Sequence, residues 1–269
     1  RTVEDSALLL SSLCGHDPRD NTTDARSAES FLTKPTNSVK GLKVGLPKEY
    51  FIPGMDGETE QAVRAAADWF QKNGAEIKEV TLPLTPSAIA VYYILATAEA
   101  SANLARFDGV RYGRRAADPK DVMDLYQRTR EEGFGPEVKR RIILGTFVLS
   151  AGYTDAYYRK AQKVRGLIRQ DFEKAFQGCD LLLTPTSPEP AFQLGERTQD
   201  PLKMYLADVF TISVNLAGTC GISLPCGFTK SNLPIGLQLI GPRFGEEKML
   251  QAAHAYEQAH DFWKRMPPS

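Results

Sequence analysis

The chain has 269 residues, with 33 basic and 33 acidic side chains and a formal net charge of zero. This length suffices for one large domain or two ordinary ones with a sizeable core. Balanced charge argues against a freestanding nucleic-acid-binding protein, because such proteins use a strong positive field. No apolar run approaches the ~20 residues of a membrane span and the start lacks signal-peptide regions, so we expect a cytoplasmic protein with no leader and no membrane contact.

Cysteines and histidines give no metal or redox motif. The four cysteines lie in apolar or glycine-flanked settings without CxxC spacing, so we expect reduced, buried thiols (Cys14, Cys179, Cys220 and Cys226). The three histidines occur singly or six residues apart, which suits neither a triad nor a metal site (His16, His254 and His260). For them we expect a solvated surface, and for the chain no metal.

The first part of the chain alternates helix and strand signals. Residues 2–5 have the form of a capping box and predict a short helix that stops at Gly15, followed by a polar surface connection over residues 16–40. Alternation over residues 42–46 predicts a strand, helical spacing over 58–73 predicts a helix, and residues 75–82 predict a second strand. This unit is typical of parallel sheets covered by helices.

Four helices are predicted next, over residues 88–106, 119–130, 136–150 and about 155–176. Tyr92 and Tyr93 fall near one side of the first, and core packing is the alternative to a functional role. The third contains three consecutive basic residues before an apolar run. Successive helical positions differ by about 100°, so one basic side chain must turn inward, and Arg141 is the best placed. The basic face of the fourth helix is expected to be solvated.

The last third predicts more strands. Residues 181–183 form a buried strand whose loop end, over residues 184–188, is where open α/β sheets place ligands. A polar connection over 195–202 precedes residues 204–228, which open polar, turn at Gly218 and Gly221, and continue as a strand over 222–225 that the proline ends. Residues 222–228 and 235–240 pair as a hairpin, and helix 246–264 closes the chain. The fold class is α/β, with a mixed, largely parallel sheet covered by helices.

Asp208 and Arg141 are the two ionisable groups that local patterns turn inward. Asp208 lies in an otherwise apolar run, where an ionised carboxylate is costly unless a cation, amide donors or a ligand ammonium meets it. A free amino acid carries a carboxylate and an ammonium, so a pocket for it needs a guanidinium and a carboxylate. Tyr92 or Tyr93 would add a hydroxyl or a wall. A structural Arg–Asp pair or two unrelated surface charges are the alternatives.

Nucleophile signatures are missing from these residues. The sequence has no GxSxG elbow, no GxxxxGK[ST], no HExxH and no GxGxxG after a strand, and its serines at 187, 213 and 223 have no evident base. Composition and pattern therefore indicate a binding scaffold, with no catalytic residue assigned.

Long sequence blocks nevertheless resemble a known family, the amidase-signature enzymes, and among them the A subunits of glutamyl-tRNA(Gln) or aspartyl-tRNA(Asn) amidotransferases. The blocks are long, specific and spread over nearly the whole chain: residues 1–5, 98–113, 137–141, 157–165, 183–186, 204–208 and 234–238. The resemblance implies that residues 1–269 are the C-terminal part of a single amidase-signature domain.

The resemblance also implies a function. Such subunits hydrolyse glutamine and send ammonia to a partner B subunit, which uses ATP and magnesium to activate the misacylated tRNA, while a small C subunit wraps the A subunit. The implied partners are therefore B and C subunits, L-glutamine and, through the B subunit, tRNA, with no cofactor in this chain. The family's glutamine-binding tyrosine, arginine and aspartate fall on Tyr92, Arg141 and Asp208.

This sequence departs from the family at the catalytic machinery. The family's Ser-Ser-Lys triad, with its Gly-Gly-Ser-Ser-Gly-Gly-Ser stretch, is absent, since residues 1–3 match the segment just after it. The nucleophile, its base and the oxyanion donors cannot be assigned here, so we expect this chain alone to be inactive. A standalone amidase acting on another amide and a non-catalytic amino-acid-binding module are the rival interpretations.

Overall fold

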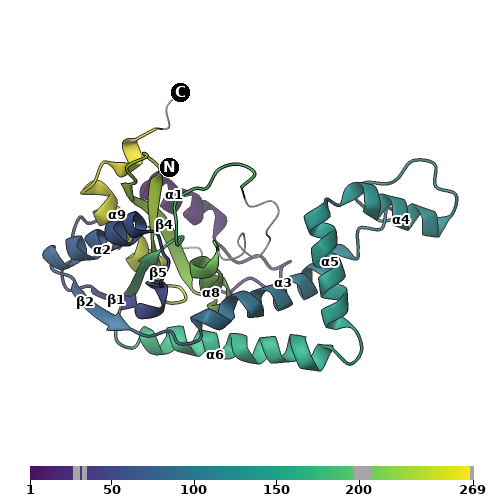
Figure 1. The fold of residues 1–269 in the computed structure, drawn as a ribbon, viewed down its shortest axis with the longest axis horizontal. Coiled ribbons are helices and arrows are strands. Elements are labelled where there is room, and N and C mark those ends of the chain that lie inside the picture. Colours follow the sequence, from purple (N-terminus) through teal and green to yellow (C-terminus); the bar gives the residue numbers. More distant parts are fainter. Residues whose placement is uncertain (27–30, 32–34, 197–206, 267–269) are drawn as a thin grey trace. The chain divides into compact units, whose positions relative to one another are not determined.

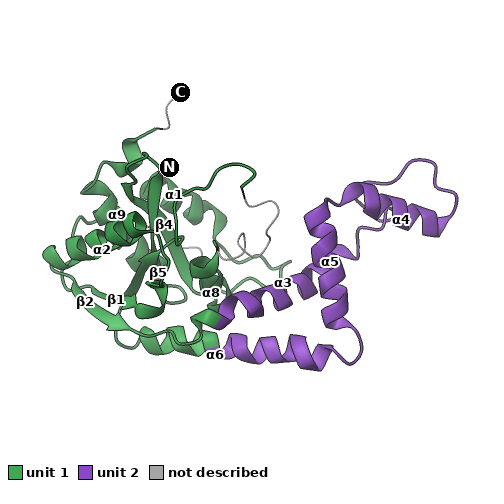
Figure 2. Ribbon diagram, viewed as in Figure 1, with its two compact units in different colours: residues 1–86, 168–269 green, residues 87–167 purple. Residues whose placement is uncertain are grey.

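The chain folds into two compact units. The computed structural model describes residues 1–26, 31, 35–196 and 207–266 (Figure 1). Unit 1 comprises residues 1–86 and 168–269 and contains the sheet, whereas unit 2 comprises residues 87–167 and is helical (Figure 2).

Unit 1 is built on a mixed sheet, which confirms the predicted α/β class. Its strands in the described residues are β1 (Lys43–Pro47), β2 (Glu76–Val80), β3 (Leu181–Pro185), β4 (Cys220–Phe228) and β5 (Pro234–Gly241). They lie in the order β2-β1-β3-β5-β4. β1 pairs in parallel with β2 and β3, and β5 pairs antiparallel with β3 and β4. The predicted strand–helix–strand unit and the C-terminal hairpin are both confirmed.

Helices α1 (Val3–Leu13), α2 (Gly57–Lys72), α8 (Val209–Ala217) and α9 (Glu246–Gln258) belong to unit 1. α2 begins where the Asp56 carboxylate accepts a hydrogen bond from the Thr59 amide at 2.8 Å. It ends at the predicted Asn73-Gly74 pair, where Gly74 has φ +93°, a region that glycine adopts without strain. Packing against the sheet brings the rings of Phe70 and Tyr256 into a stack at 5.7 Å, so α2 and α9 share one core.

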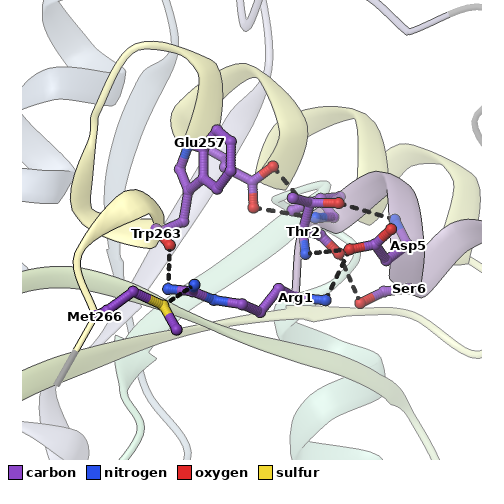
Figure 3. Close-up of polar contacts among 8 residues, drawn as sticks. Arg1, Thr2, Asp5, Ser6, Glu257, Trp263 and Met266 are labelled. Carbon is purple, nitrogen blue, oxygen red and sulfur yellow. Dashed lines mark hydrogen bonds and ion pairs between the residues drawn. The ribbon is translucent and has the colours of Figure 1, made fainter. Parts of the chain in front are cut away.

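The contact of α1 with α9 shows how the first helix is anchored (Figure 3). The predicted capping box is present, because Thr2 Oγ1 accepts from the Asp5 amide at 3.0 Å and the Asp5 carboxylate accepts from the Thr2 amide at 2.9 Å. The buried Glu257 carboxylate on α9 accepts from the Val3 amide at 3.0 and 3.2 Å. Burial raises the pKa of Glu257 above its usual range.

Unit 2 contains the predicted central helices: α3 (Ala88–Leu104), α4 (Val122–Gly133), α5 (Pro136–Leu149), a π-helical turn (Thr154–Arg159) and the first part of α6 (Lys160–Ala175). The segment predicted as one helix from about 155 therefore begins as a π turn. On α6, Lys160, Lys163 and Arg169 are exposed, as expected for a solvated basic face.

Residues 209–228 differ from the prediction in two ways. A helix, α8, occupies residues 209–217 and ends at Gly218, whose φ of +70° is left-handed. The following strand does not stop at Pro225 but continues to Phe228, with a register shift between Pro225 and Gly227. β4 is the outer strand of the described sheet, where a proline costs no ladder hydrogen bond if its nitrogen faces away from the partner strand.

Three smaller expectations need correction. The closing helix ends at Gln258, and a separate 3-10 turn spans Phe262–Lys264. His254 is buried at 5% exposure on α9, where its Nδ1 lies 4.0 Å from Glu4 Oε1 of α1, so the expected solvated position was wrong for it. Cys14 is exposed and Cys220 is half-buried, so only Cys179 and Cys226 are the buried thiols expected. The predicted connection over residues 195–202 lies largely outside the described residues.

Candidate functional site

The three predicted substrate-binding residues lie on different elements. Tyr92 is in the second turn of α3 and Arg141 is in the second turn of α5, so both belong to unit 2. Asp208 precedes α8 in unit 1. Tyr92 and Arg141 are therefore positioned together within unit 2, and Asp208 is positioned within unit 1.

A close helix crossing positions Tyr92 and Arg141. α3 and α5 pack together at Gly145, where a Cβ would come within 1.9 Å of the Thr97 carbonyl oxygen and 2.7 Å of Ser101 Cβ. Only glycine permits this approach. Gly145 lies four residues after Arg141, so the two positions lie on the same side of α5. The side that packs on α3 is therefore the side that carries the arginine.

Three groups hold the Arg141 guanidinium. Its Nε donates a hydrogen bond to Glu137 Oε1 at 2.9 Å, one helical turn earlier on α5. Its Cζ lies 5.9 Å from the centre of the Tyr93 ring, within the range of a cation–π contact. Tyr92 completes the set, since together with Glu137, the larger influence, it favours the charged guanidinium and raises the pKa of Arg141 above its usual value. The arginine is thus permanently charged and held in place.

Tyr92 and Tyr93 both lie beside Arg141. The Tyr92 and Tyr93 rings meet edge to face at 5.1 Å, and both side chains are half-buried. The Tyr93 ring lies near the guanidinium, and Tyr92 adds to the stabilisation of its charge. Both tyrosines therefore interact with Arg141 in addition to packing against each other.

Arg141 is only partly turned inward, and the apolar residues after it, on which that prediction rested, are themselves exposed: Ile143 at 69%, Leu144 at 46% and Phe147 at 49%. The Arg141 side chain is 33% exposed, while the side chain of neighbouring Arg140 is 50% exposed. Glu137 was not predicted as part of this arrangement. Its position four residues before an arginine is the signal that could have identified it, because such pairs face each other on a helix.

Asp208 differs from the expectation of a buried carboxylate. It is exposed, and its backbone carbonyl accepts hydrogen bonds from the Thr211 and Ile212 amides at 3.0 and 3.1 Å, which begins α8. Its side chain does not cap the helix. The apolar residues after it are buried within α8, beginning with Phe210, so the apolar run marks the helix and not the surroundings of Asp208. An exposed carboxylate at this point can meet a ligand ammonium.

A cavity of about 280 Å³ lies at the loop end of β3 in unit 1, where the sequence placed a ligand site. Its lining includes Thr186, Ser187, Glu189, Phe192 and Ile235. Thr186 Oγ1 and Ser223 Oγ are 2.8 Å apart, so each hydroxyl has a hydroxyl partner. This hydroxyl pair does not supply the base that a serine nucleophile needs.

Histidine, cysteine and carboxylate side chains do not cluster in the described part of the chain, and burial affects three of the thiols. Among residues 1–26, 31, 35–196 and 207–266, no group of three or more His, Cys, Asp or Glu side chains could hold a metal ion. Burial raises the pKa of the Cys226 thiol to about 12 and those of Cys179 and Cys220 to about 11, which keeps them protonated. None of the helices in the described ranges is long and apolar enough to cross a bilayer.

Residues 1–250 match the family model described as Amidase, and the chain belongs to this amidase family. Its structural neighbours share the fold. The structure of a 6-aminohexanoate cyclic dimer hydrolase, 20% identical, superposes with a TM-score of 0.78 and covers 99% of this chain and 55% of that one.

Proteins that are more similar in sequence to this chain than that hydrolase share a more specific name. The A subunit of the glutamyl-tRNA(Gln) amidotransferase from Geotalea daltonii is 56% identical over 98% of this chain, and its counterpart from Methylacidiphilum infernorum is 56% identical over all of it. The crystal structure of the corresponding Thermotoga maritima protein, 38% identical, has a TM-score of 0.75 and covers 96% of this chain. The chain spans about half the length of these relatives, 51% to 55%.

Proposed function

We propose that this chain is the substrate-binding part of the glutamine-hydrolysing A subunit of a tRNA-dependent amidotransferase, and that residues 1–269 form the C-terminal part of its single amidase-signature domain. High identity to proteins that carry this name supports the proposal. The observation that carries it is the Arg141 guanidinium, which Glu137 holds at Nε beside the Tyr93 ring. A planar guanidinium of this kind suits a carboxylate ligand.

In this proposal each end of L-glutamine has its own partner. Arg141 and Tyr92 bind the α-carboxylate, and the exposed Asp208 binds the α-ammonium. The residues of this chain therefore bind and orient the substrate, while the nucleophile and its base come from the part of the family's domain that these 269 residues do not match. Ammonia released from the side-chain amide passes to the B subunit.

The partners follow from the same proposal. B and C subunits assemble with the A subunit, tRNA is bound through the B subunit, and ATP and magnesium act there and not on this chain. We propose a cytoplasmic complex. Either Glu-tRNA(Gln) or Asp-tRNA(Asn) is the acceptor.

Ligand analogues test the site most directly. The full-length protein with its partners would be assayed for amide hydrolysis with L-glutamine, with its α-carboxamide, which lacks the carboxylate, and with glutaramate, which lacks the ammonium. A hydrogen bond to a charged group is worth about 1.5–3 kcal/mol, so each deletion should cost wild-type enzyme about ten- to a hundredfold in kcat/KM.

The variants make the assignment specific. In Arg141→Met, kcat/KM should no longer fall when glutamine is replaced by its α-carboxamide, because the partner of the carboxylate is already absent. In Asp208→Asn, kcat/KM should likewise no longer fall when glutamine is replaced by glutaramate, because the partner of the ammonium is absent. Unchanged losses in these variants would refute the assignment. Simple aliphatic amides turned over as well as glutamine would instead favour a standalone amidase. The isolated 269-residue chain is expected to release no ammonia from glutamine.

A further inference from the structure

The Glu137 carboxylate links two arginines of α5. Oε1 accepts from Arg141 Nε at 2.9 Å, and Oε2 accepts from Arg140 Nη1 at 2.6 Å. Glu137 also lies in the first helical turn, where the helix dipole favours a negative charge. Three independent attractions therefore fix this carboxylate, and through it the inner arginine.

The Glu137–Arg141 ion pair is not explained by its contribution to folding stability alone. The Glu137 side chain is 45% exposed, and ion pairs this accessible contribute little to folding. Its geometric effect is larger. A guanidinium is planar, so one hydrogen bond at Nε, together with the Tyr93 ring near Cζ, restricts the rotation that would otherwise sweep the Nη groups. The Nη end carries four of the five N–H donors, which is the end that can hold a carboxylate in bidentate fashion.

We propose that Glu137 is a positioning residue for the substrate carboxylate: it holds Arg141 by Nε and thereby directs the Nη end of the guanidinium to the ligand. This inference rests on the proposed function, since it needs Arg141 to bind the α-carboxylate of glutamine. It adds a residue that does not itself touch the substrate. Holding a long side chain in its bound rotamer before the ligand arrives removes an ordering cost that would otherwise weaken binding.

The negative charge of Glu137 would by itself weaken the binding of a substrate carboxylate, and this makes the positioning role testable. Glu137 is an anion near the place where another anion must bind, so a carboxylate that merely occupied Arg141 would compete with the ligand. Positioning and competition predict opposite changes in KM when the carboxylate is removed. The hydrogen bond at Nε needs an acceptor oxygen and no charge, which the amide of glutamine also supplies.

The experiment measures glutamine hydrolysis by the full-length protein in its complex, for Glu137→Ala, Glu137→Gln and Arg141→Lys. We expect Glu137→Ala to raise KM for glutamine about three- to tenfold, the affinity equivalent of ordering one flexible side chain, with kcat within about twofold. Glu137→Gln should restore most of the loss. Arg141→Lys should raise KM more than either.

Unit 1 offers a matched control. Glu60 stands four residues before Arg64, its Oε1 accepts from Arg64 Nε at 2.8 Å, and Arg64 Cζ lies 4.3 Å from the Phe51 ring centre. This pair repeats the Glu137–Arg141–Tyr93 arrangement on residues to which the proposal assigns no role. Glu60→Ala should leave KM unchanged, and thermal unfolding followed by circular dichroism should show that all variants are folded.

Each outcome decides one question. An unchanged or lower KM in Glu137→Ala overturns the positioning role, as does an equal rise in Glu137→Ala and Glu137→Gln, or a rise of the same size in Glu60→Ala. A fall in kcat with constant KM overturns it too. If Arg141→Lys leaves KM unchanged, the proposed function loses its carboxylate site whatever Glu137 does. If Arg141→Lys raises KM and Glu137→Ala does not, only the positioning role fails.

Discussion

Replacing Gly145 by alanine should force α3 and α5 apart. The added Cβ would stand 1.9 Å from the Thr97 carbonyl oxygen, whereas real Cβ atoms keep at least about 3.0 Å, so the helices must separate by about 1 Å. The atom it meets belongs to the backbone of α3 and cannot rotate away. Ser101 Cβ, at 2.7 Å, adds a second conflict.

Two opposing contributions set the size of the effect. Alanine is the better helix former by about 1 kcal/mol. Overpacking of a tight contact costs about 1–3 kcal/mol, and a rigid backbone obstacle puts this site at the upper end. The net change in the free energy of unfolding should therefore be a loss of about 2 kcal/mol. Because Tyr92 is on α3 and Arg141 on α5, the same displacement should raise KM for glutamine, since errors near 1 Å cost up to about a hundredfold.

Urea denaturation followed by circular dichroism, and glutamine hydrolysis by the full complex, measure the two effects. Gly166→Ala is the matched control, because Gly166 lies exposed within α6 and a Cβ there meets no atom within 4 Å. That variant should gain stability, by up to about 1 kcal/mol, with an unchanged KM. If Gly145→Ala is as stable as Gly166→Ala and binds glutamine normally, the close crossing does not position the site.

Two further predictions concern unit 1. Asp180, whose carboxylate accepts from Lys248 Nζ at 2.7 Å and from the Lys43 amide at 2.9 Å, has a pKa below its usual value owing to these contacts, despite the opposing effect of burial. A lowered folded-state pKa means that its stabilisation is present above the unfolded-state pKa and is lost as pH falls through the folded one. Asp180→Asn should therefore lower unfolding stability at pH 7 by about 1–2 kcal/mol and much less near pH 2 in urea titrations; equal losses at both would contradict this. Of the four thiols, exposed Cys14 should react fastest with a maleimide at pH 7, while Cys179, Cys220 and Cys226 react slowly until unfolding, as mass spectrometry of labelled peptides would show.

The parts of the fold that sequence could predict are those with a clear period. The alternation of β1, the helical spacing of α2 and the Asn73-Gly74 stop all led to the observed β1–α2–β2 unit. α8 escaped because it is short, six of its nine residues are apolar and several are β-branched, and its polar side consists only of Thr211 and Asn215. A buried helix and a buried strand look alike in such a stretch.

Sequence reasoning named the charged residues of the candidate site but not Glu137, which supports Arg141. Counting around the helix predicted that one basic residue turns inward, and Arg141 is half-buried. The apolar run around Asp208 suggested an apolar environment, although Asp208 is exposed at the start of α8, because a residue before a buried helix shares its sequence neighbourhood and not its surroundings. Gly145 carried no signal at all, since the need for glycine there comes from Thr97 on another helix.

The outer strands of the described sheet also bear on intermolecular aggregation. β4, at one edge, carries Pro225 and the shift in register beside it, and β2, at the other, carries Glu76, Lys78 and Glu79. A proline offers no N–H to an incoming strand. Charged side chains along an edge hinder pairing with another sheet, because they repel like charges on it and would lose their hydration on contact. Both edge strands are thus poorly suited to pair with a strand of a second molecule. This property matters most while the chain is being synthesised and its sheet is still incomplete.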